Sequence, residues 1–414
     1  DQYHFESSFE NFQNSFSKNN NKQIQISLPV NSTDFENFLF IKQNPFSKEL
    51  SEKFPDIDIY RGRSLDSDKS AFISFVDQKI NISILDSKYK TVIISSKNKD
   101  IFILKPKIKE EKIPESGFEN DLIETPDLIK KKTNRESINR IGFSTKLKKY
   151  RIAILTTAEW SNYFIDLYEA NDQDLEAKKA IVISEIGIAL SGLNKVTERD
   201  LGITFELVNN SEKLIEFDTN LDGLTNNNKN VLINEGAKII NDIIEDPDTA
   251  ESEYDIGHTF YNGGGGLAYL RSLCLPGRFK ARGVSGGLTG VGFYFVFLHE
   301  IGHMLGAPHT FNNHPEIGAD GNMVESGSGV TIMGYGPRGE RNLYYHAYSL
   351  REMNAVIQAR DCGTFVDNFQ NAAPVFKTNP PKLSYSIPAG TPFSLGDNFE
   401  ITDANNEYKD LLFN

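Results

Sequence analysis

The stretch HEIGHMLGAPH, which begins at His299, constrains this chain more than any other feature. His299 and His303 are four residues apart, so on a helix both imidazoles project from the same face. Glu300 lies between them, and Gly306 tolerates the left-handed conformation that lets a helix end in a sharp turn. That turn would bring back His309 as a third ligand. Three imidazoles with an open fourth position are typical of a catalytic zinc site rather than a structural one.

A second motif, TIMGYG, follows the third histidine and contains Met333. An isolated methionine is usually core filler. A methionine in a tight turn after an extended zinc motif has another use, as an apolar floor beneath the metal ligands. Tyr335 lies two residues further on and is a candidate to stabilise an oxyanion. A packed turn tyrosine is the alternative interpretation, and the sequence leaves both open.

The N-terminal quarter of the chain predicts a small, mostly antiparallel β domain over residues 1–108. Residues 1–20 are polar and aromatic and are interpreted as a loose leader. After them come short runs in which apolar and polar residues alternate, separated by polar turns, as in half-buried strands. These runs are residues 23–30, 56–62, 71–77, 79–86 and 89–96.

Residues 109–149 predict an exposed linker that a protease could cut, because charge is dense, prolines interrupt and periodicity is poor. A solvated charged loop is the simpler interpretation of any single basic residue there. The candidate cleavage points are Lys130, Lys131, Lys132, Arg135, Arg140, Lys146, Lys148 and Lys149.

The remainder of the chain predicts an α+β domain over residues 150–365, with a mixed sheet and long helices. Apolar residues recur at helical spacing in three segments and form buried runs in four others. The expected helices are residues 172–199, 230–245 and 291–306. The expected strands are residues 150–157, 202–208, 213–217 and 266–273. Residues 366–414 begin with a proline-rich linker and continue as the start of a β-sandwich-like module.

The overall composition excludes several classes of protein. The net charge is −13, which disfavours binding to nucleic-acid phosphates. The sequence contains no run of 18 apolar residues, so we expect no membrane span. The first 20 residues lack the apolar core of a secretion signal. Cys274 and Cys362 are the only cysteines, and their spacing alone is compatible with free thiols or with a disulfide.

Four stretches resemble the metzincin zinc metallopeptidases, in particular the reprolysin-like (adamalysin-related) group in its bacterial secreted branch. They are DIGHTFYNGGGGLAYLRSLC, HEIGHMLGAPHTF, ESGSGVTIMGYG and YYHAYSLREM, spread over residues 255–353. The N-terminal β domain, with FPDIDIYRGRS, resembles the propeptides of that group. Thr310 after the third histidine and Tyr335 in the Met-turn depart from the animal and venom reprolysins.

The resemblance implies a secreted or cell-surface zinc metalloendopeptidase that acts on protein or peptide substrates. His299, His303 and His309 would hold one zinc ion, Glu300 would be the general base, and Met333 would lie in the Met-turn. It also implies a Cys274–Cys362 bridge and a strand that pairs with extended substrate. The residues of that strand are Gly266, Leu267, Ala268 and Tyr269.

The resemblance also implies a proenzyme, in which residues 1–149 keep the protease inactive. These residues contain no cysteine, so a cysteine thiolate bound to the metal cannot be what blocks activity. We expect the β domain to act as an intramolecular inhibitor that covers the cleft, with a carboxylate as the blocking group. The candidates are Asp56, Asp58, Asp121 and Glu124.

Other expectations are less specific. Calcium on Asp320 and Glu325 is possible chemistry, but a scattered pair of acids on a glycine-rich loop does not support it. His4, His258, His314 and His346 lack ligand spacing and are expected to pack or face solvent. We expect a monomer. The alternative function is an exported adhesion or binding protein whose protease domain is inactive or very narrow in specificity.

Overall fold

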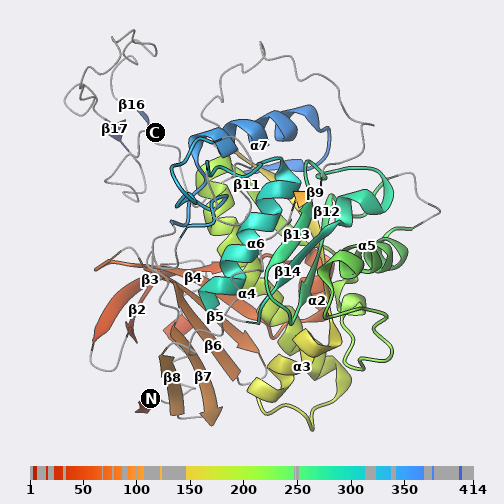
Figure 1. The fold of residues 1–414 in the computed structure, drawn as a ribbon. Coiled ribbons are helices and arrows are strands. Elements are labelled where there is room, and N and C mark those ends of the chain that lie inside the picture. The colour runs from red at the N-terminus through yellow and green to blue at the C-terminus, as the bar shows by residue number, and fades with distance from the viewer. Residues whose placement is uncertain are drawn as a thin grey trace.

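The computed structural model describes the chain in segments, which cover parts of both predicted regions. These are residues 3–6, 15–16, 23–30, 34–67, 69–76, 79–85, 92–98, 101–106, 122–123, 146–246, 248, 251–288, 290–312, 323–336, 342–367, 375–376 and 401–402. The predicted α+β class is confirmed, with an antiparallel sheet at the N-terminus and a mixed sheet with long helices after it (Figure 1).

The N-terminal region is an eight-stranded antiparallel sheet in the order β1-β8-β7-β6-β5-β4-β3-β2. Its strands are β1 (Tyr3–Glu6), β2 (Ile24–Pro29), β3 (Phe35–Gln43), β4 (Asp58–Ser64), β5 (Ser70–Val76), β6 (Lys79–Leu85), β7 (Val92–Asn98) and β8 (Ile101–Pro106). A short helix, α2 (Lys48–Lys53), follows β3. Strand β5 is buried on both faces, because one face packs on the sheet's own core and the other lies against α4.

The prediction of a loose leader over residues 1–20 is wrong where the structure describes it. Strand β1 pairs with β8, and Phe16 is buried in the sheet's core against Phe40, Tyr60 and Phe75. The partners of these residues lie far along the chain. Local composition, which is polar with scattered aromatics, does not reveal such contacts.

The second region contains a mixed sheet in the order β11-β10-β12-β14-β13-β9, with β15 also paired to β10. Its strands are β9 (Leu122–Ile123), β10 (Lys146–Thr156), β11 (Ile203–Leu207), β12 (Ile256–Tyr261), β13 (Gly266–Tyr269), β14 (Gly283–Gly286) and β15 (Thr364–Asp367). The helices are α3 (Ala158–Leu167), α4 (Leu175–Leu201), α5 (Lys229–Ile244), α6 (Gly290–Leu305) and α7 (Ala347–Ala359). The three predicted helices therefore correspond to α4, α5 and α6.

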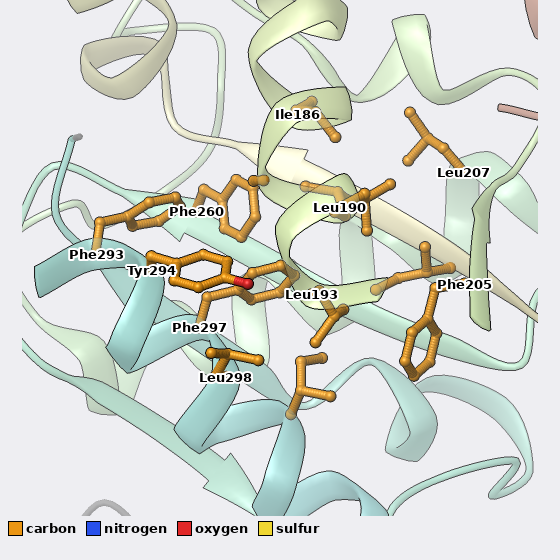
Figure 2. Packing of buried hydrophobic residues seen from close by; sticks show 14 of the residues in the cluster. Ile186, Leu190, Leu193, Phe205, Leu207, Phe260, Phe293, Tyr294, Phe297 and Leu298 are labelled. Atoms are coloured by element: carbon orange, nitrogen blue, oxygen red, sulfur yellow. The ribbon is translucent and has the colours of Figure 1, made fainter. Parts of the chain in front are cut away.

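Helix α4 is the central element of the molecule. The side chain of Asp174 caps its first turn, and Gly202 ends it in a left-handed conformation with φ 65°. One side of α4 contacts β5 of the N-terminal sheet, and another contacts α6. Figure 2 shows the core that joins α4 to β11, β12 and α6. By length and composition α4 could cross a membrane, but 89% of its apolar window is buried inside the protein, as in a core helix.

Three boundaries in the second region differ from the predictions. Residues 213–217 were expected as a strand, but Ser211–Leu214 form a 3-10 helix and only Ile215 makes a bridge, to Thr156. Strand β13 ends at Tyr269 because the chain turns at Arg271, where φ is 61°. Strand β10 begins at Lys146, inside the stretch predicted as a linker.

This early start removes Lys146, Lys148 and Lys149 from the candidate cleavage points, since all three lie in a paired strand. Lys148 Nζ donates to the carbonyl oxygens of Ile357 and Arg360 at 3.1 and 3.0 Å. The other basic candidates lie outside the described residues. Of the predicted C-terminal module, the structure describes β16 (Val375–Phe376) and β17 (Ile401–Thr402), which pair antiparallel.

Polar contacts join the N-terminal sheet to the second region. Arg61 on β4 forms an ion pair with Glu198 on α4 at 2.9 Å. Lys53 on α2 forms one with Glu212 at 2.7 Å. Asn81 on β6 donates to the buried carboxylate of Glu185 on α4 at 2.7 Å. The N-terminal sheet is thus attached to the helix that also supports α6.

Candidate metal centre

Helix α6 carries the first part of the site. His299 and His303 lie one turn apart on it, both fully buried, with ring centroids 4.6 Å apart. The helix ends at Leu305 because Gly306 adopts φ 121°, a value that strains any residue with a side chain. An added Cβ at Gly306 would also lie 2.6 Å from Val356. The chain then returns, and His309 reaches the same point.

The three imidazoles form one compact cluster. One ring nitrogen from each of His299, His303 and His309 lies within 4.8 Å of the others. The predicted ligands, ten residues apart along the chain from first to last, are therefore brought together around a point that one ion could occupy.

Backbone carbonyls set the tautomers of the two helical histidines. The Nδ1 of His299 lies 2.7 Å from the carbonyl oxygen of Ile332, and that of His303 lies 2.7 Å from the carbonyl oxygen of Ala307. A carbonyl only accepts hydrogen bonds, so each Nδ1 must carry the proton. Each Nε2 therefore presents its lone pair, as a metal ligand must.

Glu300 is fully buried on the same helix and packs directly against strand β13. A Cβ added at Gly266 would lie 2.2 Å from Glu300 Oε1, so only glycine allows this approach. The neighbouring Tyr261 has its pKa raised, first by burial and then by the charge of Glu300. The carboxylate thus lies against the strand predicted to bind substrate, on the same helix as two of the histidines.

The segment of residues 331–336, predicted as a turn, packs against α6 and contacts two of the histidines. Met333 is fully buried, and a Cβ added at Gly302 of α6 would lie 2.6 Å from its sulfur. Ile332 supplies the carbonyl that accepts from His299. Tyr335 places its hydroxyl 2.8 Å from His309 Nε2, so this side chain lies at the cluster as well as in the packed turn.

Glu325 is a site residue whose role sequence reasoning missed. Its carboxylate is mostly buried and accepts hydrogen bonds from the hydroxyls of Thr310 and Thr331 and from the amides of Val330 and Thr331. Burial raises the pKa of Glu325, but these hydrogen bonds outweigh it and hold the pKa below the ordinary value. The only sequence signal was an acid in a glycine-rich loop, for which calcium binding was considered. Asp320, the other acid considered, lies outside the described residues.

Strand β13 has neighbours on both sides. It pairs antiparallel with β14, and Ala268 and Tyr269 pair in parallel with Leu122 and Ile123 of β9. The edge expected to receive substrate is therefore covered by a two-residue strand from the region predicted as a linker. A short apolar pair in a charged segment was the only sequence signal for this contact.

Among the candidate blocking carboxylates, Asp58 forms an ion pair with Lys42 at 2.5 Å on the N-terminal sheet, and Asp56 is exposed in the turn before β4. Asp121 and Glu124 flank β9 in sequence and lie outside the described residues.

The expected disulfide is present. Cys274 follows β13 and Cys362 follows α7, with their Cα atoms 6.3 Å apart. The bridge ties the last helix of the domain to the segment beside the candidate substrate strand. The amide of Cys274 also donates to the carbonyl of Asp255 at 2.9 Å.

The remaining histidines that the structure describes do not join the cluster. His258 Nε2 lies 2.8 Å from the hydroxyl of Ser285, and burial lowers the pKa of this histidine to about 3. His346 caps α7 by accepting from the amide of Tyr348 at 3.1 Å. The side chain of His4 and all of His314 lie outside the described residues.

These residues fit a zinc ion. The donors are three buried imidazole nitrogens, two of them with the tautomer that coordination requires, and among the residues that the structure describes no other ligand joins their cluster. Such a set leaves a position for water or substrate, as catalytic zinc sites do.

The comparisons agree with this geometry. Residues 183–310 match the profile of the Metallo-peptidase family M12B Reprolysin-like. The fold is similar to the crystal structure of metalloproteinase-II from Bacteroides fragilis, with 10% sequence identity and a TM-score of 0.50; the match covers 84% of this chain and 96% of that one.

A structure of a chaperone–substrate complex matches with 15% identity over 51% of this chain and 35% of that chain, but its TM-score of 0.29 supports no argument. No curated protein matches the chain. The profile match includes His299, Glu300, His303 and His309. The two findings support a reprolysin-like metallopeptidase domain that contains the histidine cluster.

Proposed function

We propose that this chain is a zinc-dependent metalloendopeptidase that is exported and held latent by its N-terminal region. The observation that carries the proposal is the convergence of three buried imidazoles beside a buried glutamate and a glycine-bearing strand. An adhesion protein would not need a complete set of ligands with an acid beside them.

Zinc bound by the three imidazoles would supply Lewis-acid chemistry, lowering the pKa of water and polarising the scissile carbonyl. Glu300 is the base in this proposal. It takes the proton of the attacking water and then gives it to the leaving amine. Burial of Glu300 strengthens its interaction with that proton. The main chain at Gly266 packs directly against the Glu300 carboxylate and limits its movement. Tyr335 is the candidate oxyanion donor, since its hydroxyl lies beside His309.

Strand β13 is the proposed substrate strand. Its main chain lies directly beside Glu300, so a peptide paired along it would run past the reacting groups. Pairing through main-chain hydrogen bonds recognises an extended backbone, and side-chain pockets add preference. This arrangement supports internal cleavage of peptides rather than removal of terminal residues.

Latency is supported by two features. The N-terminal sheet is attached to α4 by the contacts of Arg61 and Asn81, and α2 is attached to the 3-10 helix after β11 by the ion pair of Lys53. Strand β9 pairs with Ala268 and Tyr269, so a substrate must displace it to use that part of the edge. Asp121 and Glu124 flank β9, and we favour them over Asp56 and Asp58 as the blocking group.

Export is supported by the disulfide, since such bonds persist in oxidising compartments. In this proposal the prosegment spans residues 1–108, the linker 109–149 contains the activation site, and the catalytic domain spans 150–365. The monomeric state stays a prediction.

The test is cleavage of a mixed peptide library by the intact chain, the chain trimmed by limited trypsin digestion, and the trimmed Glu300→Ala variant. We expect only the trimmed chain with Glu300 to cleave. We also expect Glu300→Ala to retain zinc and to lose turnover at least about 100-fold, because general acid–base catalysis contributes that much.

The same experiment can contradict the latency, the role of Glu300 and the protease activity separately. Equal cleavage by intact and trimmed chains would rule out latency. Cleavage by Glu300→Ala at the unsubstituted rate would remove Glu300 as the base. Zinc binding with no cleavage by any form would favour the binding protein.

A further inference from the structure

We infer that Glu325 is a positioning residue for the metal centre, joining the loop of the third imidazole to the turn that supports the first. This inference deepens the proposed function and rests on it. The residue lies eight positions before Met333 in the chain and contacts none of the three histidines directly in the hydrogen bonds that the structure describes.

The first half of the connection reaches His309. One carboxylate oxygen of Glu325, Oε2, accepts from the hydroxyl of Thr310, the residue directly after that histidine. The amide of Glu325 also donates to the carbonyl of Thr310 at 2.8 Å. Side chain and main chain therefore hold the same residue, which leaves the third ligand little freedom to move away.

The second half of the connection joins Glu325 to the turn at residues 331–336. Glu325 Oε2 also accepts from the hydroxyl of Thr331 at 2.6 Å, and Oε1 accepts from the amides of Val330 and Thr331 at 3.0 and 3.1 Å. Thr331 precedes Ile332, whose carbonyl accepts from His299 Nδ1. The carboxylate thus fixes the segment that sets the tautomer and orientation of the first ligand.

The surroundings are built closely around this carboxylate. Gly329 adopts φ 73°, and a Cβ added there would lie 3.1 Å from Glu325 Oε2. The amide of Thr310 donates to the carbonyl of Met333 at 3.3 Å, so the two loops also meet without the carboxylate. Four donors converge on Glu325, which explains why both oxygens are directed inward rather than toward a solvent cation.

Groups that orient metal ligands without binding the metal typically contribute about 10- to 100-fold to metal affinity or activity. Removal of this carboxylate leaves buried amides and hydroxyls without their acceptor, and the two loops lose their common anchor. The effect should therefore appear in zinc affinity, independently of turnover.

The experiment measures the zinc dissociation constant of the full chain by competition with a chromophoric chelator, and the visible spectrum of the cobalt-substituted chain. For Glu325→Ala we expect zinc affinity to fall by about 10- to 100-fold and the cobalt bands to change. For Glu325→Gln we expect a change of less than about threefold, because the hydroxyls of Thr310 and Thr331 can turn to accept from the new amide.

The matched control is Glu245→Ala. Glu245 is also a partly buried carboxylate with several internal donors, from Ser252, Glu253 and Lys280. It follows the last residue of α5, and the hydrogen bonds described for it involve none of the three histidines. We expect the zinc affinity of the Glu245→Ala variant to match that of the unsubstituted chain, even if the variant is less stable.

If Glu325→Ala does not fold, Thr310→Val and Thr331→Val each remove one donor with little change in shape. We expect each to weaken zinc binding by about threefold or more. Affinities within twofold of the unsubstituted chain in folded Glu325→Ala, or in both valine variants, would overturn the inference. The proposed function is judged separately, by zinc binding and cleavage of the unsubstituted trimmed chain.

Discussion

A buried carboxylate between the two regions predicts how stability depends on pH. Glu185 lies on α4, where Asn81 Nδ2 donates to its Oε1 and Oε2 at 2.7 and 3.0 Å and Tyr168 donates to Oε1 at 2.5 Å. Desolvation raises the pKa of Glu185 from 4.5 to about 7, although both hydrogen-bonding partners act in the opposite direction. The substitution Glu185→Gln removes this titration and keeps the shape.

The sign follows from which state binds the proton more tightly. In the unfolded chain the carboxyl has its ordinary pKa of 4.5, and in the folded chain its pKa is about 7. Between these values the unfolded chain has released the proton while the folded chain keeps it. The free energy of unfolding therefore falls as pH rises from about 4.5 to about 7 and is constant on either side.

The magnitude comes from the difference between the two pKa values, at about 1.4 kcal/mol per pKa unit. The free energy of unfolding should fall by roughly 3 kcal/mol across that window in the unsubstituted chain. In Glu185→Gln this part of the fall is absent. The new amide can pair with Asn81 once the Asn81 amide rotates and presents its oxygen.

The assay is urea unfolding at pH 4 to 8, followed by the fluorescence of Trp160, the chain's one tryptophan, which is buried near α4. A Glu300→Ala background prevents self-digestion. The quantity of interest is the unfolding free energy of Glu185→Gln minus that of the parent, since other groups titrate equally in both. We expect it to rise by about 3 kcal/mol from pH 4 to pH 8.

A difference that stays constant to within about 1 kcal/mol over this range would refute the reasoning. Tyr168→Phe gives a second check. It deletes a hydrogen bond that lowers the pKa of Glu185, so the fall in stability should extend to higher pH.

Two further predictions concern the site and its frame. Gly266→Ala should reduce kcat by about 100-fold with zinc binding retained, because the added Cβ displaces the Glu300 carboxylate. Peptide cleavage measures kcat and zinc titration measures metal binding. An unchanged kcat would show that the carboxylate adapts to the added Cβ. Its control is Gly277→Ala, where a Cβ meets nothing within 4 Å and only stability should fall, by about 1 kcal/mol. Replacing Cys274 and Cys362 together with serine should lower the unfolding free energy by about 2–4 kcal/mol in urea titrations, and an unchanged midpoint would contradict this.

Much of the fold could be predicted because its signals are local. Apolar spacing located α4, α5 and α6 to within a few residues, and alternation located most strands of the N-terminal sheet. Failures came where long-range contacts override local pattern. Residues 213–217 look like a strand, but only Ile215 finds a bridging partner, and the preceding residues close into a 3-10 turn.

The sequence by itself determined the pair His299 and His303 with Glu300, because the helical repeat places them without help from the rest of the chain. It also determined the turn at Gly306, where only glycine adopts the required φ without strain. Tertiary structure decided the rest: the approach of Tyr335 to His309, the network of Glu325, and the pairing of β9 with β13. These contacts join residues far apart in the chain, so no local period encodes them, and they form only when the core around α4 and α6 has brought their loops together.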